Sequence, residues 1–387
     1  MKNIVVRGPL ITASGYGEHA RQVFKWVSSI EDAKISTQLT PWGNTTWYIN
    51  PDGLDGLVGQ IMGCSGPLER QGADVSFQIQ LPNEWDPMLA RFNVGVTAAV
   101  ETDICHPEWV TACNKMDLVI VPSVHTKQTI CNSGNVTTPI EVIPEAYFDE
   151  CSKENVEEID LNLNTDFNFL MVGTLTGDNP YNDRKNTYNT VKWFCETFEG
   201  NKDVGLVIKA SSGRATTLDR ILTKRALKGL LSEVRTGDYP RVSLLHGLMS
   251  GDEMTSLYRD KSIKCFIGLT RGEGYGLPIL EASVHKIPVI ATNWSGHLDF
   301  MNRGKFISVS YRLEEVHDSR IDGHIFIKGS KWAEPSEENF KQRLKTFYKK
   351  PAMPAEWADD LGEKLRTSHS MSAIKEHYNK IYYEYIK

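Results

Sequence analysis

Two glutamates with a glycine-rich run between them form the segment whose residue types best suit chemistry. Glu273 and Glu281 flank a run that contains Gly274, Gly276 and Pro278. The glycines permit positive φ in a turn, and proline favours the first position of a helix. We therefore expect a turn into a helix with Glu281 in its first turn, where the helix dipole attracts anions. The N–H groups expected to face the anion are those of Gly274, Tyr275, Gly276 and Leu277.

The anion that this segment suits is a diphosphate that carries a sugar. A carboxylate accepts hydrogen bonds from hydroxyl groups, so one glutamate can hold a sugar ring and the other a ribose diol. These negative groups need offsetting positive charge. Arg184 and Lys185 follow a predicted strand, residues 169–173, and are expected to supply it, with solvated surface charge as the alternative. Lys209, which ends another predicted strand, either faces the diphosphate or is an ordinary strand-end lysine.

An alternation of strands and helices must position these residues. Short apolar runs bounded by turn residues suit strands that are buried on both faces of a parallel sheet. Such runs occur at residues 4–6, 75–79, 94–100, 118–122, 169–173, 204–209, 242–246, 265–269 and 288–292. Helix-length segments between them include 18–28, 187–198 and 250–259. The alternation predicts an α/β fold of two Rossmann-like, doubly wound domains, with ligands bound at the carboxyl ends of the strands.

An acidic stretch with little apolar periodicity separates the two series of strands. We expect an N-terminal, acceptor-side domain over residues 1–150, a linker over 151–166 and a donor-binding domain over 167–365. Residues 366–387 form a tail in which Ile374, Tyr378, Ile381, Tyr382 and Tyr385 recur at helical spacing, as in an amphipathic helix.

The spacing of the two glutamates, with the glycines and proline inside it and Pro288-Val-Ile-Ala-Thr after it, resembles a known donor site. It is similar to that of retaining GT-B glycosyltransferases of the glycogen-synthase-like superfamily, glycosyltransferase family four. By this resemblance Arg184 and Lys185 correspond to the phosphate-binding pair, and the loop with Gly247 and Leu248 contacts the nucleotide base. The N-domain loop that closes over the diphosphate would be formed by Gly15, Tyr16 and Gly17. The tail would return to pack on the N-domain.

The resemblance also implies a mechanism and one departure from the family. The anomeric configuration would be retained by front-face attack, and the departing diphosphate would take the acceptor's proton. Many relatives carry a histidine on the N-domain strand end that faces the anomeric carbon. Here residues 98–103 occupy that place, and Glu101 or Thr102 is expected to do its work. The family implies a nucleotide-sugar donor, most commonly a UDP-sugar, and no further cofactor.

We expect no metal, because the chain lacks the Asp-x-Asp motif that binds divalent ions in the other major glycosyltransferase fold. The acceptor is expected to be a hydroxyl of a saccharide or a glycolipid. The alternative is a phage-type DNA glycosyltransferase that acts on hydroxymethylated cytosine, since Arg214, Arg220, Lys224, Arg225 and Lys228 could contact a nucleic-acid backbone. A remote alternative is a non-catalytic protein that binds a nucleotide-sugar.

Motif and composition narrow the class of protein and the compartment in which it is expected. An oxidoreductase is disfavoured because the loop at residues 14–20 lacks the third glycine of the dinucleotide fingerprint. The seven cysteines are scattered and odd in number, which favours reduced thiols in a cytoplasm, the host's if the protein is viral. The net charge of −6 gives no global attraction to nucleic acid, and no apolar run is long enough to span a bilayer. The oligomeric state stays open.

Overall fold

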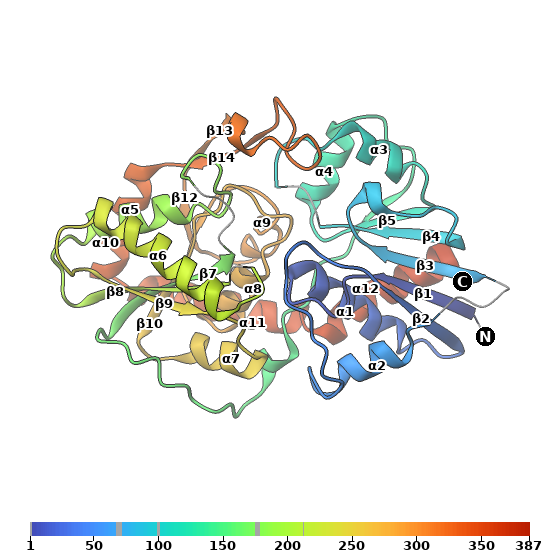
Figure 1. The fold of residues 1–387 in the computed structure, drawn as a ribbon, viewed down its shortest axis with the longest axis horizontal. Helices are drawn as coiled ribbons and strands as arrows, with labels where there is room; N and C mark the ends of the chain where they lie inside the picture. The colour runs from blue at the N-terminus through green and yellow to red at the C-terminus, as the bar shows by residue number, and fades with distance from the viewer. Residues whose placement is uncertain (1, 67–71, 99–100, 175–178, 212) are drawn as a thin grey trace. The chain divides into compact units, whose positions relative to one another are not determined.

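The computed structural model describes residues 2–66, 72–98, 101–174, 179–211 and 213–387 (Figure 1). The chain divides into two compact units. Unit 1 comprises residues 1–146 together with 371–387, and unit 2 comprises residues 147–370. Each unit contains a six-stranded parallel sheet with helices, which confirms the predicted α/β fold class. No helix within these described ranges is long and apolar enough to cross a membrane.

The sheet of unit 1 has the strand order β2-β1-β3-β4-β5-β6. All five pairings are parallel. Its strands are β1 (Lys2–Gly8), β2 (Ala33–Leu39), β3 (Ala73–Ile79), β4 (Ala90–Val96), β5 (Leu118–Val121) and β6 (Ile140–Val142). Its helices are α1 (Gly15–Val27), α2 (Leu57–Gly63), α3 (Pro107–Cys113), α4 (Val124–Asn132) and α12 (Met371–Ile381), followed by a π-helical turn at Tyr382–Ile386, with a 3₁₀ turn, η1, at Pro82–Glu84.

The C-terminal tail completes the core of unit 1. Ile374, Tyr378 and Ile381 of α12 are buried at helical spacing in the same apolar cluster as α1. Trp26 of α1 stacks on Tyr378 with ring centroids 4.8 Å apart, and its indole N–H donates to Asn379 Oδ1 at 3.0 Å. Figure 1 shows the tail in red beside the blue elements of this unit. The expected amphipathic helix is therefore present, with its last turn wound as a π-helix.

The sheet of unit 2 has the order β12-β11-β10-β7-β8-β9, again with parallel pairings throughout. Its strands are β7 (Phe167–Thr174), β8 (Val204–Ser211), β9 (Arg241–His246), β10 (Ile263–Gly268), β11 (Val289–Thr292) and β12 (Ile307–Val309), with a separate hairpin of β13 (Tyr311–Glu315) and β14 (Lys331–Pro335). Its helices are α5 (Thr187–Thr197), α6 (Thr217–Val234), α7 (Gly251–Arg259), α8 (Leu277–Val284), α9 (Leu298–Met301), α10 (Glu337–Lys349) and α11 (Ala352–Ser368), with 3₁₀ turns η2 (Asp149–Ser152) and η3 (Asp318–Arg320).

Apolar side chains fill both faces of this second sheet. Phe169 points into a cluster shared with α5 and α10, whereas Leu170 points into a cluster shared with α7, α8 and α11. Because successive strand residues face opposite sides, a strand covered on both faces must be apolar throughout. This is why the strands of unit 2 are visible in the sequence as short continuous runs.

The stretch predicted as a linker, residues 151–166, packs on helix α7. The Ile159 N–H donates to Ser256 Oγ at 2.9 Å, and Arg259 donates to the carbonyl oxygens of Cys151 and Lys153. The chain enters unit 2 at Tyr147 and leaves it after Ser370. These two segments lie together, since the Tyr147 N–H donates to the His369 carbonyl at 3.1 Å.

Candidate functional site

A pocket in unit 2 lies where the order of strands reverses. From β7 the chain builds outward to β8 and β9, and then returns to place β10 on the other side of β7. Parallel sheets bind ligands at the carboxyl ends of the strands at such a point. The pocket is lined there by Lys185, Thr270, Glu273 and Pro278, and backed by residues of β7 and β10.

Glu273 is the centre of a buried charge cluster in this pocket. Lys185 Nζ lies 2.7 Å from Oε1 of the carboxylate, and Arg184 Nη1 lies 3.4 Å from Oε2. Burial alone would raise the pKa of Glu273, but the Lys185 and Arg184 charges outweigh it and lower the pKa to about 2. The carboxylate is therefore ionised at neutral pH, and the cluster carries a net positive charge.

Arg271 holds the loop that carries Glu273 in place. Its side chain is buried, forms a 2.7 Å ion pair with Glu334, and donates to the carbonyl oxygens of Pro180 and Asp183. Its backbone N–H donates to the Arg184 carbonyl at 2.9 Å. Both loops of the pocket are thus tied to one guanidinium. This function was not predicted, because Glu334 lies far along the chain and no local pattern connects it to Arg271.

The glycine-rich run forms a tight turn that leads into helix α8. Gly276 adopts a φ of 103°, in the left-handed region that favours glycine, and caps the helix without a side chain. Pro278 lies in the first turn as expected. The Tyr275 side chain is buried and packs edge-on against Phe300, so only its backbone can face the pocket. Leu277 begins the helix.

The expectation that Glu281 lies in the first turn of this helix is wrong. The helix begins at Leu277 and not at Pro278, so Glu281 falls after the first turn, which holds no acidic residue. The Glu281 side chain is buried, and the Tyr258 hydroxyl donates to its Oε2 at 3.0 Å. His285 stacks on Tyr258 and donates to the Glu281 carbonyl. The Tyr258 contact fixes the orientation of the carboxylate and was not predicted from sequence.

The loop after β11 supports the same turn. The Glu273 N–H donates to Ser295 Oγ, and the Gly296 N–H donates to the Glu273 carbonyl, both at 2.9 Å. A Cβ at Gly296 would lie 2.1 Å from the Gly274 carbonyl oxygen, so the two loops approach too closely for any side chain there. His297 is fully buried and bonds the Thr292 carbonyl, and burial lowers its pKa, which keeps it neutral.

Three more of the predicted donor-binding residues lie one strand further along the sheet. Lys209, near the end of β8, is buried and donates to the Gly247 carbonyl at 2.6 Å. Burial lowers the pKa of Lys209, although nearby Glu253 opposes this effect. Gly247 has a φ of 122°, and Leu248 after it is 45% exposed. Lys209 is thus bonded to the loop that carries Gly247 and Leu248.

The remaining predicted residues belong to unit 1, at the strand reversal between β1 and β3. Gly15, Tyr16 and Gly17 open helix α1, and the Gly17 N–H donates to Ser14 Oγ. The Tyr16 hydroxyl bonds Thr97 Oγ1 and accepts from the Ala98 N–H, which joins the helix start to the end of β4. In the predicted segment 98–103, residues 99 and 100 lie outside the described part of the chain. Glu101 follows them and is partly buried.

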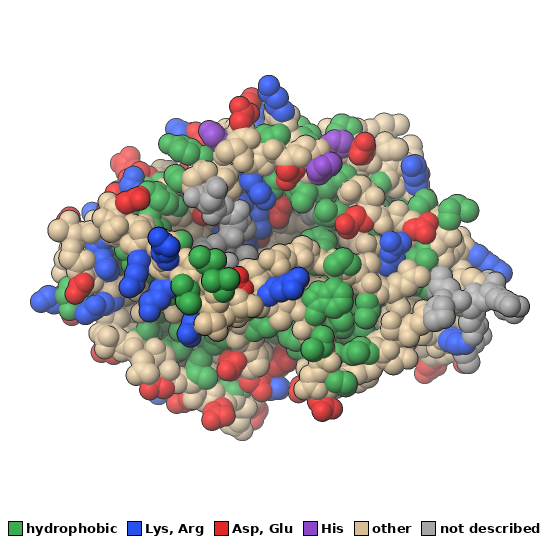
Figure 2. Space-filling view, viewed as in Figure 1, with side chains coloured by type: hydrophobic (Ala, Val, Ile, Leu, Met, Phe, Trp, Pro, Cys, Tyr) green, Lys and Arg blue, Asp and Glu red, His purple; other side chains and the backbone are tan. Residues whose placement is uncertain are grey.

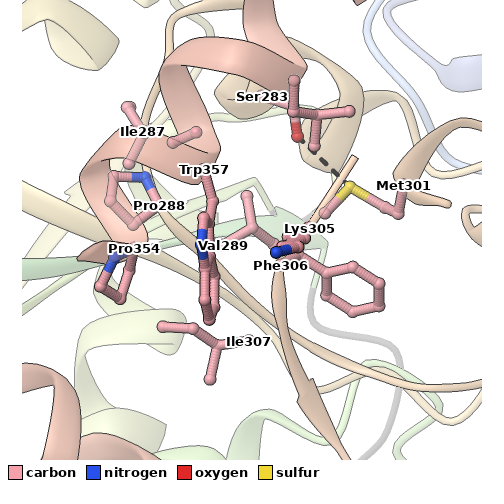
Figure 3. A pocket seen from close by; sticks show the side chains of 12 residues that line it. Ser283, Ile287, Pro288, Val289, Met301, Lys305, Phe306, Ile307, Pro354 and Trp357 are labelled. Carbon is pink, nitrogen blue, oxygen red and sulfur yellow. Dashed lines mark hydrogen bonds between the residues drawn. The ribbon is translucent and has the colours of Figure 1, made fainter. Parts of the chain in front are cut away.

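A second pocket in unit 2 has a different character (Figure 3). Its lining is apolar, with Val289, Met301 and Trp357 facing one another, and Lys305 is its single charged residue. The Ser283 hydroxyl donates to the Ile279 carbonyl at 2.8 Å and lies 3.4 Å from the Met301 sulfur. This pocket offers no pair of groups for acid–base chemistry or phosphate binding.

Comparisons with known proteins agree with the architecture. No protein-family model matches the sequence, and no curated protein matches it at a significant level. Among solved structures, sucrose-phosphate synthase from Thermosynechococcus elongatus is 14% identical, with a TM-score of 0.66 and 99% of both chains covered. Anabaena HepE in complex with UDP and glucose is 12% identical, with a TM-score of 0.67 over 99% of this chain and 100% of that one.

A glycosyltransferase from Rickettsia africae matches over 100% of this chain and 98% of its own, at 14% identity and a TM-score of 0.64. At such identities the likeness concerns the fold. The chain therefore has the GT-B fold, two Rossmann-like α/β units, over its whole length.

Proposed function

We propose that this protein is a retaining glycosyltransferase that moves a sugar from a nucleotide-sugar, most simply a UDP-sugar, to a hydroxyl acceptor. The observation that carries the proposal is the Glu273 carboxylate, held ionised between Lys185 and Arg184 at the entrance of helix α8. A carboxylate kept charged can accept hydrogen bonds from sugar hydroxyls. The two cations beside it can bind the diphosphate, which is the leaving group of the reaction.

Each part of the donor has a matching group in unit 2. The start of α8 has no side-chain cap among the described residues and presents the positive end of the helix to a diphosphate. Glu281, oriented by Tyr258, is assigned to the ribose diol. The loop with Gly247 and Leu248 is assigned to the base, with Lys209 close to it. HepE was solved with UDP, with UDP and glucose, and with UDP-glucose, which supports UDP as the nucleotide.

The reaction that we assign breaks the bond between the anomeric carbon and the diphosphate oxygen, and forms one to the acceptor oxygen on the same face. The acceptor's proton passes to the departing diphosphate. Lys185 and Arg184 stabilise the charge that develops on the leaving group, and Glu273 positions the sugar. Glu101 is assigned to the catalytic place of the family's N-domain histidine, and Gly15, Tyr16 and Gly17 are assigned to the donor's diphosphate. No metal is used in this scheme, so EDTA should leave turnover unchanged.

A thermal-shift panel of UDP, GDP and ADP with their sugars tests the donor. A ligand that binds the folded protein raises its midpoint of unfolding, and we expect the UDP compounds to do so. Glu273→Gln should remove the preference for UDP-sugar over UDP, whereas the exposed glutamate variant Glu199→Gln serves as a matched control. If no nucleotide shifts the midpoint, the donor site is refuted.

The acceptor and the stereochemistry need a separate assay. We propose a saccharide or glycolipid hydroxyl in the cytoplasm, and expect the coupling constant of the product's anomeric proton to show retention. Transfer only to DNA that contains hydroxymethylcytosine would instead establish the DNA-modifying alternative. Donor binding without hydrolysis or transfer to any acceptor would indicate the non-catalytic alternative.

A further inference from the structure

Helix α6 exposes apolar side chains on the side that faces away from the core of unit 2. Along its 18 residues, Thr223 is the one that is fully buried. Its inward face is formed by Leu227, Leu230, Leu231 and Val234, which pack against the cluster beneath α5. The helix is therefore held along one side, mainly by its C-terminal half.

A second apolar stripe lies on the opposite side of α6. Leu218, Ile221 and Leu222 are 63%, 56% and 53% exposed. Their spacing of three and four residues places them on one face, and at 100° per residue that face lies roughly opposite Thr223 and Leu227. Isolated exposed leucines need no explanation, but three aliphatic side chains at contact spacing on one helix face do.

Basic residues lie within this stripe and along one side of it. Arg225 continues the row four residues after Ile221, and Lys224 and Lys228 lie beside Ile221 on that side, all of them exposed. Arg220 and Arg214 add two more exposed positive charges. Helix α6 carries two acidic residues. Asp219 accepts bonds from the Thr216 N–H and hydroxyl and the Arg214 N–H as part of the helix cap, and Glu233, near the C-terminal end, accepts from the Tyr188 hydroxyl. Figure 2 shows Lys and Arg side chains gathered over α6 with hydrophobic ones beside them.

We propose that this face of α6 docks on the surface of an anionic lipid bilayer. A helix with aliphatic side chains on one face and flanking Lys and Arg lies in the membrane interface, where both the apolar burial and the charge attraction contribute. The chain as a whole carries a net charge of −6, so the attraction belongs to this face and not to the protein at large. The inference is independent of the sugar-transfer reaction.

Two other occupants fit the face less well. A nucleic-acid backbone would use the five basic residues but has no contact to offer Leu218, Ile221 and Leu222. A second copy of the chain would cover the aliphatic stripe, but a two-fold contact would bring Arg225 and Lys228 close to their own symmetry mates. Of these three occupants, the anionic bilayer satisfies both the apolar and the basic part of the surface.

Flotation of the full chain with vesicles tests the proposal. We expect binding to vesicles that contain 30% phosphatidylglycerol, and none to pure phosphatidylcholine at the same salt. Leu218→Ser/Ile221→Ser/Leu222→Ser should weaken binding about tenfold or more. Lys224→Gln/Lys228→Gln should weaken it about 25-fold, roughly fivefold for each charge, and raised salt should have the same effect. Because these side chains are exposed, the variants should unfold at the wild-type temperature.

A matched control alters exposed residues elsewhere in unit 2. Met353, on α11, is 56% exposed, and Lys345 and Lys349 of α10 are also exposed, so Met353→Ser and Lys345→Gln/Lys349→Gln should leave vesicle binding unchanged. Absence of binding to the anionic vesicles, or equal loss in the control variants, would overturn the proposal. So would binding to duplex DNA that is insensitive to the aliphatic substitutions, or a dimer that dissociates when they are made.

Discussion

Each unit of this protein starts a helix at a strand reversal with a glycine-bearing turn, yet the two turns are built differently. Helix α1 of unit 1 is capped by its own sequence, since Ser14 accepts a bond from the Gly17 N–H. Helix α8 of unit 2 is capped by Gly276, with no side-chain bond among the described residues. The first helix start therefore has a side-chain cap, whereas the second is formed by a glycine turn of the backbone.

The charges around the two turns differ in the same sense. Beside α1, Arg21 pairs with Glu18 at 2.9 Å and donates to the Leu10 and Thr12 carbonyl oxygens, so its charge serves the loop itself. Beside α8, Lys185 and Arg184 both contact the Glu273 carboxylate, at 2.7 and 3.4 Å, and line the predicted donor site. Two cations beside a helix start without a side-chain cap suit an anion, and unit 2 brings these features together in its described residues.

Loss of the Glu281 carboxylate should have the largest effect. Glu281→Ala removes both hydrogen bonds assigned to the ribose diol, which we expect to cost about 4 kcal/mol, or roughly a thousandfold in donor affinity. Titration calorimetry with the UDP-sugar measures this. A variant that stays folded in circular dichroism and binds with wild-type affinity would remove the main reason for treating the two turns as different.

Acid should destabilise unit 2 through Glu273. Its pKa in the folded protein, about 2, lies below the ordinary value of 4.5, so the ionised group stabilises the fold above pH 4.5. That contribution, on the order of 3 kcal/mol, is lost as the pH falls from 4.5 towards 2. In Glu273→Gln the unfolding free energy should decline less steeply over this window. Parallel urea titrations of both proteins at several pH values give the comparison, and identical slopes would contradict it.

A pair of glycine substitutions sharpens the comparison in unit 1. A Cβ at Gly17 would lie 2.2 Å from the Thr12 carbonyl oxygen, whereas one at Gly15 would meet nothing within 4 Å. Gly17→Ala should therefore destabilise unit 1 by about 3 kcal/mol, and Gly15→Ala by almost nothing. Thermal unfolding distinguishes them. Since Gly15→Ala leaves the fold intact, any loss of donor affinity in that variant would show that this turn also contacts the donor.

Tyr258→Phe should give the smallest effect. It removes the hydroxyl that donates to Glu281 Oε2 and leaves the ring stacked on His285. We expect donor affinity to fall by about fivefold, near 1 kcal/mol, because the carboxylate is less well oriented. Calorimetry of this variant and of Glu281→Ala separates the effect of orienting the Glu281 carboxylate from the effect of its direct contact with the donor. An effect as large as that of Glu281→Ala would mean that the tyrosine itself contacts the donor.

The sequence was sufficient for strands that are continuous apolar runs, and at the sheet edges it identified β9 but not β2. The buried strands β5 and β10 are continuous apolar runs and were predicted. The edge strand β2 and the hairpin β13–β14 were missed. Most side chains of β2 and β13 are partly buried or exposed, and β14 buries Trp332 and Ala333 but flanks them with charged residues. An edge needs one neighbour instead of two, so its residues are less constrained.

The same distinction applies to the candidate site. Residues such as Glu273, Lys185 and Gly276 were identified because local turn chemistry and charge mark them. The contacts that hold the site in place were not predicted, because Arg271 pairs with Glu334, and Glu281 with Tyr258, across long stretches of chain. Such contacts leave no periodic signal. The start of α8 was misplaced by one residue because the proline suggested the boundary, whereas Gly276 sets it.

The return of the tail to unit 1 has a consequence for how the protein is made. Strands β1 to β6 are synthesised first. The stacking of Trp26 on Tyr378 can form only after all of residues 147–370 have been synthesised. Unit 2 is contiguous and can complete its core in the meantime. A chain that ends before Met371 would therefore contain all of unit 2 but would lack part of the core of unit 1. The unit whose synthesis begins first is thus the last to complete its core.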